Sequence, residues 1–144
     1  MRDNGAASDL LSIVNQHATA LHLMFTACGT TCPIQAAIFQ RVQHLLVDQV
    51  ARGIQLLSLS IDPEHDTPAV LSQWLERFHA RPGWVAAAPH LKDLERLRDF
   101  AGRGQSASDN HSTQVLLLDR KGRLFWRTSE LPEAEEFVDI LRQI

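Results

Sequence analysis

The sequence predicts an α/β protein whose sheet lies between layers of helices. Apolar runs of strand type alternate along the chain with segments of helical periodicity. Two of the strand-type runs, Ala20–Thr26 and Ile54–Ile61, are separated by one long helical segment, as in a parallel strand–helix–strand unit. A hairpin and a last helix then close the chain, which predicts a mixed sheet.

The first part of the chain leads into the first strong strand. Residues 1–8 contain Asn4-Gly5 and small side chains, and we expect them to be flexible. Apolar residues at helical spacing predict a short helix or a turn over Ser8–Gln16. In the strand Ala20–Thr26, alternation divides the side chains between two faces, with Leu21, Leu23 and Phe25 on one and His22 and Met24 on the other.

The middle of the chain predicts a helix, a buried strand and a second helix. Pro33–Arg52 keeps the longest helical period in the sequence. Ile54–Ile61 is almost continuously apolar, which is typical of a strand covered on both faces. Thr67-Pro68 then supplies an N-cap followed by a proline at the first helical position, so we expect a helix that runs to about Ala80.

The last part of the chain completes the sheet. The expected elements are a short strand Trp84–Ala87, a helix Leu91–Ala101, a hairpin of Val115–Leu118 and Leu124–Arg127 around the turn Asp119–Gly122, and a helix Pro132–Ile144. The polar segment Gly102–Ser112 reads as a loop. This order predicts a single thioredoxin-like α/β domain: a three-layer sandwich with a central mixed sheet and a C-terminal β-hairpin plus helix.

Composition excludes several classes of function. The chain has 144 residues, 44% hydrophobic and 22% charged, as in an ordinary globular domain. A formal net charge of -3 and a pI of about 6.1 give no support for nucleic-acid binding. The sequence shows no apolar stretch of the roughly 18 residues that a transmembrane helix needs. We also find no signal peptide or membrane anchor in the polar N-terminus.

The two cysteines, Cys28 and Cys32, bracket the break between the first strand and the following helix. A helix N-terminus carries a partial positive charge, which favours thiolate over thiol. Two cysteines are too few for a disulfide framework, so a metal site or a redox pair is the functional interpretation. The alternative is a pair of buried structural cysteines, because a three-residue spacing between cysteines is common by chance.

Three pieces of the chain together resemble the SCO/SenC family of copper-binding, thioredoxin-like proteins. The first is the strand–Cys-x-x-x-Cys-Pro–helix stretch. The second is Leu59–Pro68, which is close to the family's S-[IV]-D-P-E-x-D-T-P signature. The third is His111, just before the predicted hairpin. Compared with the family's pattern, we expect the N-terminal hairpin to be reduced or missing and the loop before His111 to be short.

The resemblance implies a metal site and a role. Cys28, Cys32 and His111 would be the ligands of a copper ion, Cu(I) or Cu(II). The protein would deliver copper to cytochrome c oxidase or maintain the thiols of its copper centre, which makes it a metallochaperone rather than an enzyme. Its partners would be an oxidase subunit or another copper chaperone, in the periplasm or at a membrane. Thiolates suit Cu(I), and imidazole suits either oxidation state.

Other functions remain open from the sequence alone. In a thiol–disulfide oxidoreductase or peroxiredoxin-like reductase, Cys28 would attack and Cys32 would resolve the mixed disulfide. A redox or copper sensor and a zinc site are further alternatives. We expect His65 to be exposed and His22 to be a core histidine. Asp62 and Asp66 read as turn or cap residues, although Asp62 also lies at a strand end, where sites gather.

Overall fold

The computed structural model describes residues 1–5, 10–27, 31–46, 52–102 and 114–144. Within these ranges the strands form one sheet in the order β3-β2-β1-β4-β5. The strands are β1 (Ala18–Met24), β2 (Ile54–Ser60), β3 (Trp84–Ala87), β4 (Leu116–Leu118) and β5 (Leu124–Arg127). The helices are α1 (Leu10–Val14), α2 (Thr31–Leu45), α3 (Pro68–Arg77), the 3-10 turn η1 (Leu91–Asp93), α4 (Leu94–Gly102) and α5 (Ala134–Gln143).

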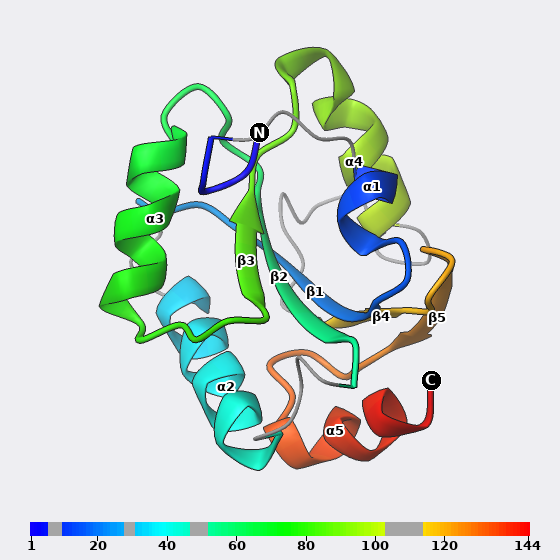
Figure 1. Ribbon diagram of the computed structural model, residues 1–144. Helices are drawn as coiled ribbons and strands as arrows, with labels where there is room; N and C mark the ends of the chain where they lie inside the picture. Colours follow the sequence, from blue (N-terminus) through cyan, green and yellow to red (C-terminus); the bar gives the residue numbers. More distant parts are fainter. Residues whose placement is uncertain (6–9, 28–30, 47–51, 103–113) are drawn as a thin grey trace.

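The sheet is mixed, as the sequence predicts. β1, β2 and β3 are parallel, with α2 and α3 as the two crossovers between them. β4 pairs with β1 in the antiparallel direction, and β5 completes a hairpin with β4. The expected element order and the thioredoxin-like α/β architecture are therefore confirmed. Figure 1 shows α2 and α5 on one side of the sheet, and α1 and α4 on the other.

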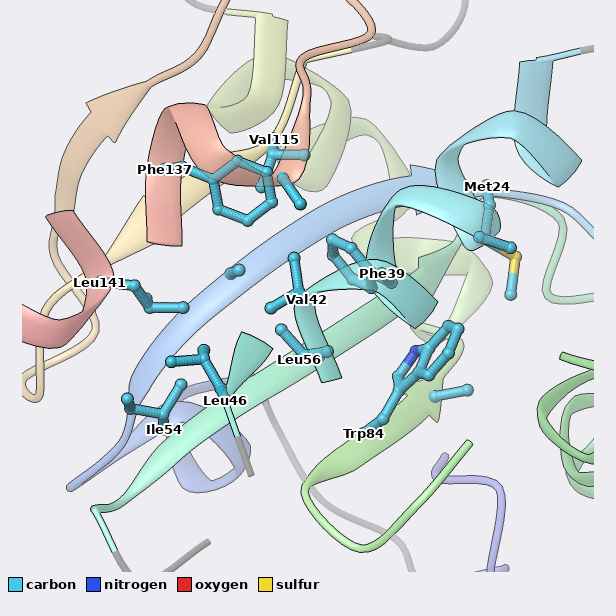
Figure 2. Packing of buried hydrophobic residues seen from close by; sticks show 14 of the residues in the cluster. Met24, Phe39, Val42, Leu46, Ile54, Leu56, Trp84, Val115, Phe137 and Leu141 are labelled. Atoms are coloured by element: carbon cyan, nitrogen blue, oxygen red, sulfur yellow. The ribbon is translucent and has the colours of Figure 1, made fainter. Parts of the chain in front are cut away.

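The alternation of β1 is confirmed by two separate cores, one on each face of the sheet. Ala18, Ala20 and Met24 pack in the cluster that includes residues of α2, α3 and α5. Figure 2 shows part of this cluster, with Phe39 of α2 facing the sheet. Leu21 and Leu23 pack on the opposite face with residues of α1 and α4. Strands buried on both faces need apolar residues at nearly every position, which explains their continuous apolar runs.

Both boundaries of helix α2 differ from the expected ones. Helix α2 begins at Thr31 rather than Pro33, and it ends at Leu45 rather than at Arg52. The carbonyl of Leu45 accepts a hydrogen bond of 2.8 Å from the guanidinium of Arg142 in α5, which satisfies one of the groups a helix end leaves unpaired. The rest of the expected segment, 47–51, lies outside the described residues.

The cap at the start of α3 is confirmed. The Thr67 hydroxyl accepts a hydrogen bond of 3.3 Å from the amide of Val70, and Pro68 occupies the first turn. The first residues of the chain, for which we expect flexibility, lie along the outer edge of β3. There the amide of Asp3 donates to the carbonyl of Ala86 at 2.9 Å.

Candidate metal centre

The three predicted ligands are carried by two segments of the chain. Cys28 and His111 both lie outside the described residues, in the ranges 28–30 and 103–113. Cys32 is the second residue of α2, so its backbone stands in the first turn of a 15-residue helix. Pro33 also falls in this first turn, where its missing N–H has no intrahelical partner to lose.

The sheet register brings the points where these two segments join the sheet to the same end of its strands. β4 runs antiparallel to β1, and Leu116 at the start of β4 is paired with Leu21 in the middle of β1. The chain that enters β4 and the chain that leaves β1 are therefore joined to the same end of the sheet. His111 precedes Leu116 by five residues, which can span at most about 17 Å.

A buried carboxylate joins the ends of β1 and β2. The side chain of Asp66 accepts hydrogen bonds from the amide of Thr26 at 3.1 Å and from the Thr26 hydroxyl. It also accepts one from the Ser60 hydroxyl at 2.6 Å. Asp66 is only 2% exposed. Thr26 lies two residues before Cys28, so this carboxylate holds the chain that leads from β1 to the first cysteine.

The hydroxyl of Ser60 also orders the turn that follows β2. While it donates to Asp66, its oxygen accepts a hydrogen bond of 3.0 Å from the amide of Asp62. The Asp66 amide in turn donates to the Asp62 carbonyl at 2.9 Å. The expected turn at Asp62 is therefore confirmed, but the interpretation of Asp66 as a turn or cap residue misses what its side chain does.

The neighbouring pair of Asp62 and His65 is exposed. His65 Nδ1 lies 2.9 Å from Asp62 Oδ1, and the His65 side chain is 78% accessible, which confirms its expected exposure. The hydrogen bond that His65 donates to the Asp62 carboxylate, together with the negative charges of Asp62 and its neighbours, raises the pKa of His65 above 6.5. This histidine is therefore more readily protonated than an isolated one, and it lies on the surface beside the turn.

The chain that follows His111 is fastened at the start of the hairpin. The amide of Val115 donates to the Thr128 hydroxyl at 2.8 Å, and the Thr128 amide donates back to the Val115 carbonyl at 3.1 Å. Gln114 Nε2 donates to the Thr128 carbonyl at 2.7 Å. Because Thr128 is 2% exposed, these bonds tie the described end of the loop to the interior.

His22 is the core histidine that the sequence predicts. Its ring is 0% exposed and packs against Phe39 with ring centroids 4.6 Å apart. Nε2 lies 2.6 Å from the Ser58 hydroxyl, and Nδ1 lies 3.3 Å from Oε1 of Gln35. Gln35 belongs to α2, one helical turn after Cys32. A buried network therefore connects β1 to the start of the helix that carries the second cysteine.

The part of the chain that the structure describes contains no group of three or more His, Cys, Asp or Glu side chains able to hold a metal. Two of the three predicted ligands lie outside that part, so the ligand set stays a prediction. Across the described ranges, none of the helices is both long and apolar enough to cross a membrane.

Fold and sequence together define the class of protein. The architecture is that of a thioredoxin-like protein with a cysteine in the first turn of the helix after β1. The SCO1/SenC family model matches residues 11–144, so the chain belongs to the SCO1/SenC family. A SCO2-like protein of Rickettsia prowazekii is 27% identical over 115 residues, 74% of this chain and 56% of that protein. The mitochondrial SCO2 homologue of Bos taurus is 28% identical over 131 residues, 85% of this chain and 49% of that protein.

Solved structures share the fold at low sequence identity. A SCO1/SenC family lipoprotein of Bacillus anthracis superposes with a TM-score of 0.82 at 19% identity, over 99% of this chain and 89% of that one. ScoI of Bradyrhizobium japonicum, solved with copper bound, gives a TM-score of 0.78 at 20% identity, over 99% of this chain and 94% of that one. The chain spans about half the length of the two curated relatives above.

Sequence reasoning missed the residues that hold the candidate site in place. Asp66, Ser60 and Thr26 form one buried hydrogen-bond cluster, although forty residues separate Thr26 from Asp66. Their signal is visible in hindsight, because each is a short polar residue that ends or follows a strand of the parallel part of the sheet. Side chains at the carboxyl ends of such strands meet at one edge.

Proposed function

We propose that this chain binds a copper ion through the thiolates of Cys28 and Cys32 and the imidazole of His111. In this role it delivers copper to a cytochrome c oxidase copper centre or maintains the thiols of that centre. The observation that carries the proposal is membership of the SCO1/SenC family, whose model covers all three residues. A relative of the same fold, ScoI of Bradyrhizobium japonicum, has been solved with copper bound.

The chemistry of the donor set fits copper. Soft thiolates favour Cu(I), whereas imidazole is compatible with both oxidation states. Two sulfurs and one nitrogen leave room for a ligand from a partner, which a protein that hands its metal on requires. The donors also differ from those of structural zinc sites, which are closed by four protein ligands.

The fold supports this ligand set through the positions of the connecting segments. Cys32 stands in the first turn of α2, where unpaired N–H groups favour a thiolate. The chain that bears Cys28 leaves β1 at one end of the sheet, and the chain that bears His111 enters β4 at the same end. Two segments distant in sequence are thus joined to one place in the fold.

Metal binding in such a site is coupled to the protonation and oxidation of the cysteines. Each thiol must lose its proton before it binds the metal, so affinity rises with pH until both are thiolates. A disulfide between Cys28 and Cys32 would remove both sulfur donors. The redox state of the pair therefore determines whether copper can be held.

An anaerobic titration of the reduced protein with Cu(I), against a competing chelator, tests the proposal. We expect one equivalent to bind, and we expect His111→Ala to weaken binding by at least about tenfold. The matched control is His44→Ala, because His44 is exposed in the last turn of α2, far along the helix from Cys32. Equal and weak binding by wild type and His111→Ala would contradict the three-ligand site.

Thiol–disulfide exchange is the second candidate function. It is favoured by the thioredoxin-like fold together with Cys32 at a helix N-terminus. Here Cys28 attacks a client disulfide and Cys32 displaces the client thiol, so the client gains two electrons and the pair becomes a disulfide. Loss of reductase activity in Cys28→Ser, with His111→Ala equal to wild type, would favour this function over copper binding.

A further inference from the structure

The buried carboxylate of Asp66 lies where the chain leaves β1 for the cysteines. We propose that Asp66 is a positioning residue for the Cys28–Cys32 dithiol, acting through its hydrogen bonds to Thr26. The inference rests on the proposed function, because it concerns the same cysteine pair. It adds a residue that binds neither copper nor a client, and that sets how readily the two thiols meet.

The need to fill space in the interior does not explain why a carboxylate occupies position 66. Burial of a charged group is costly unless hydrogen bonds or an opposite charge compensate for it. Among the described residues, none of the ion pairs includes Asp66. Its compensation comes instead from neutral donors: the Thr26 amide, the Thr26 hydroxyl and the Ser60 hydroxyl. A carboxylate, with two oxygens that only accept, can serve all three donors at once.

Asp66 lies in the turn between β2 and α3, and it is held between the end of β2 and the start of α3. Its partner Ser60 is the last residue of β2. Thr67, which follows Asp66 directly in the chain, caps α3. The Asp66 amide donates to the Asp62 carbonyl at 2.9 Å. The hydrogen bonds to Thr26 therefore tie the exit of β1 to the end of β2 and the start of α3.

The far side of the cysteine stretch is fixed as well. Gln35 is 1% exposed, and its Oε1 lies 3.3 Å from Nδ1 of His22 in β1. Thr26 and Gln35 thus bound the stretch that contains both cysteines, and each contacts a buried partner. Fixing the two ends raises the effective concentration of one thiol toward the other, as a short linker does for two tethered groups.

This arrangement predicts a measurable property of the dithiol that does not involve copper. In a glutathione buffer, the protein dithiol reacts with oxidised glutathione to give the protein disulfide and two molecules of reduced glutathione. The protein loses two electrons and two protons, and the glutathione disulfide gains them. The equilibrium constant of this reaction reports how favourably the native fold brings the two sulfurs together.

The test measures this constant for wild type, Asp66→Asn, Thr26→Val and Thr26→Ser. Asparagine keeps the size of Asp66 but turns one acceptor into a donor, so at least one of the three donors loses its partner. We expect Asp66→Asn to lower the constant by about fivefold, the equivalent of one ordinary hydrogen bond. Thr26→Val should lower it in the same direction, and Thr26→Ser, which keeps a hydroxyl, should restore the wild-type value.

The matched control is Gln55→Ala. Gln55 is also a buried polar residue, 7% exposed, but it lies at the opposite end of β2 and donates to the Ile13 carbonyl. We expect it to lower the free energy of unfolding and leave the equilibrium constant unchanged. A shift in Gln55→Ala as large as that in Asp66→Asn would overturn the proposal, since both would then reflect general destabilisation. Wild-type constants in both Asp66→Asn and Thr26→Val would overturn it too.

Two features keep the result interpretable. If Asp66→Asn does not fold, the comparison of Thr26→Val with Thr26→Ser decides the matter, because Thr26 is only half-buried. The measurement also contains no metal. Failure of the wild-type protein to bind Cu(I) would refute the proposed function while leaving the positioning role to stand or fall on the glutathione equilibrium.

Discussion

Nε2 of the His22 ring lies 2.6 Å from the hydroxyl oxygen of Ser58, and the two residues are directly paired in β1 and β2. The indole N–H of Trp84 donates to the same hydroxyl oxygen at 2.9 Å. The Ser58 hydroxyl has one hydrogen and two lone pairs, so it can serve both the indole and the imidazole. On the other side of the ring, Nδ1 of His22 lies 3.3 Å from Oε1 of Gln35, so the network links β1, β2 and β3 with α2.

Ser58→Ala tests the importance of this network for stability. The substitution leaves the Trp84 indole N–H and His22 Nε2 without their buried partner, and we expect the free energy of unfolding to fall by about 1–3 kcal/mol. Urea denaturation measures the change. Ser72→Ala in α3, where serine is half-buried, is the control, and it should change stability little. Equal stability of Ser58→Ala and wild type would show that the network contributes nothing.

Asp62→Asn tests the cause of the raised pKa of His65. The pKa of His65 lies above 6.5 because Asp62 stabilises the protonated ring, so the variant should bring this pKa down toward 6.5. The folded-state pKa is the higher one. The pair's contribution to stability is therefore fully present below 6.5 and is lost as pH rises through the folded-state pKa. NMR titration of the ring protons measures the shift, and Asp93→Asn, an acidic residue of η1, should not reproduce it.

Gly122→Ala tests the hairpin turn. Gly122 has φ +78, and a Cβ there would lie 2.9 Å from Cγ2 of Val14. Gly5 has φ +84 with nothing within 4 Å of a Cβ, so Gly5→Ala carries the backbone cost alone. We expect Gly122→Ala to destabilise the protein by about 1–3 kcal/mol more than Gly5→Ala, because the turn must move to relieve the contact. Equal thermal stability of the two variants would contradict this.

Oxidation should release copper from the loaded protein. Formation of the Cys28–Cys32 disulfide removes both thiolates, and one imidazole alone is a weak site. Treatment of the copper-loaded protein with excess oxidised glutathione, followed by gel filtration, should leave less than about a tenth of the copper bound. The copper-loaded wild-type protein, kept without oxidant and passed over the same column, is the control for slow loss. If the oxidised protein retained all of its copper although its thiols had reacted, the cysteines would be excluded as ligands.

Most of the fold could be predicted because local patterns and packing agree. β2 is largely apolar and is buried throughout, and Thr67-Pro68 begins α3 as its cap chemistry indicates. The end of α2 could not be predicted. The apolar period continues through Leu46, which is itself buried, but the helix ends at Leu45, whose carbonyl is bound by Arg142 from the other end of the chain. A contact between such distant residues leaves no mark on local periodicity.

The donor chemistry of the candidate site could be proposed from the sequence, but the hydrogen bonds that hold the neighbouring chain in place could not. The residue types at positions 28, 32 and 111 indicate soft and borderline metal donors, and the family resemblance selects them. The buried contacts of Asp66 with Thr26 arise only when β1 and β2 pair, because the two residues lie forty positions apart. The ligand set itself stays a prediction, since two of its members lie outside the described residues.

X-ray absorption spectroscopy of the Cu(I)-loaded protein tests the central claim most directly, because it reports the atoms bound to copper. The account predicts two sulfur ligands and one nitrogen ligand in wild type, and loss of the nitrogen in His111→Ala with both sulfurs retained. A spectrum without sulfur, or an identical nitrogen contribution in wild type and His111→Ala, would contradict the assignment of Cys28, Cys32 and His111 as the copper site.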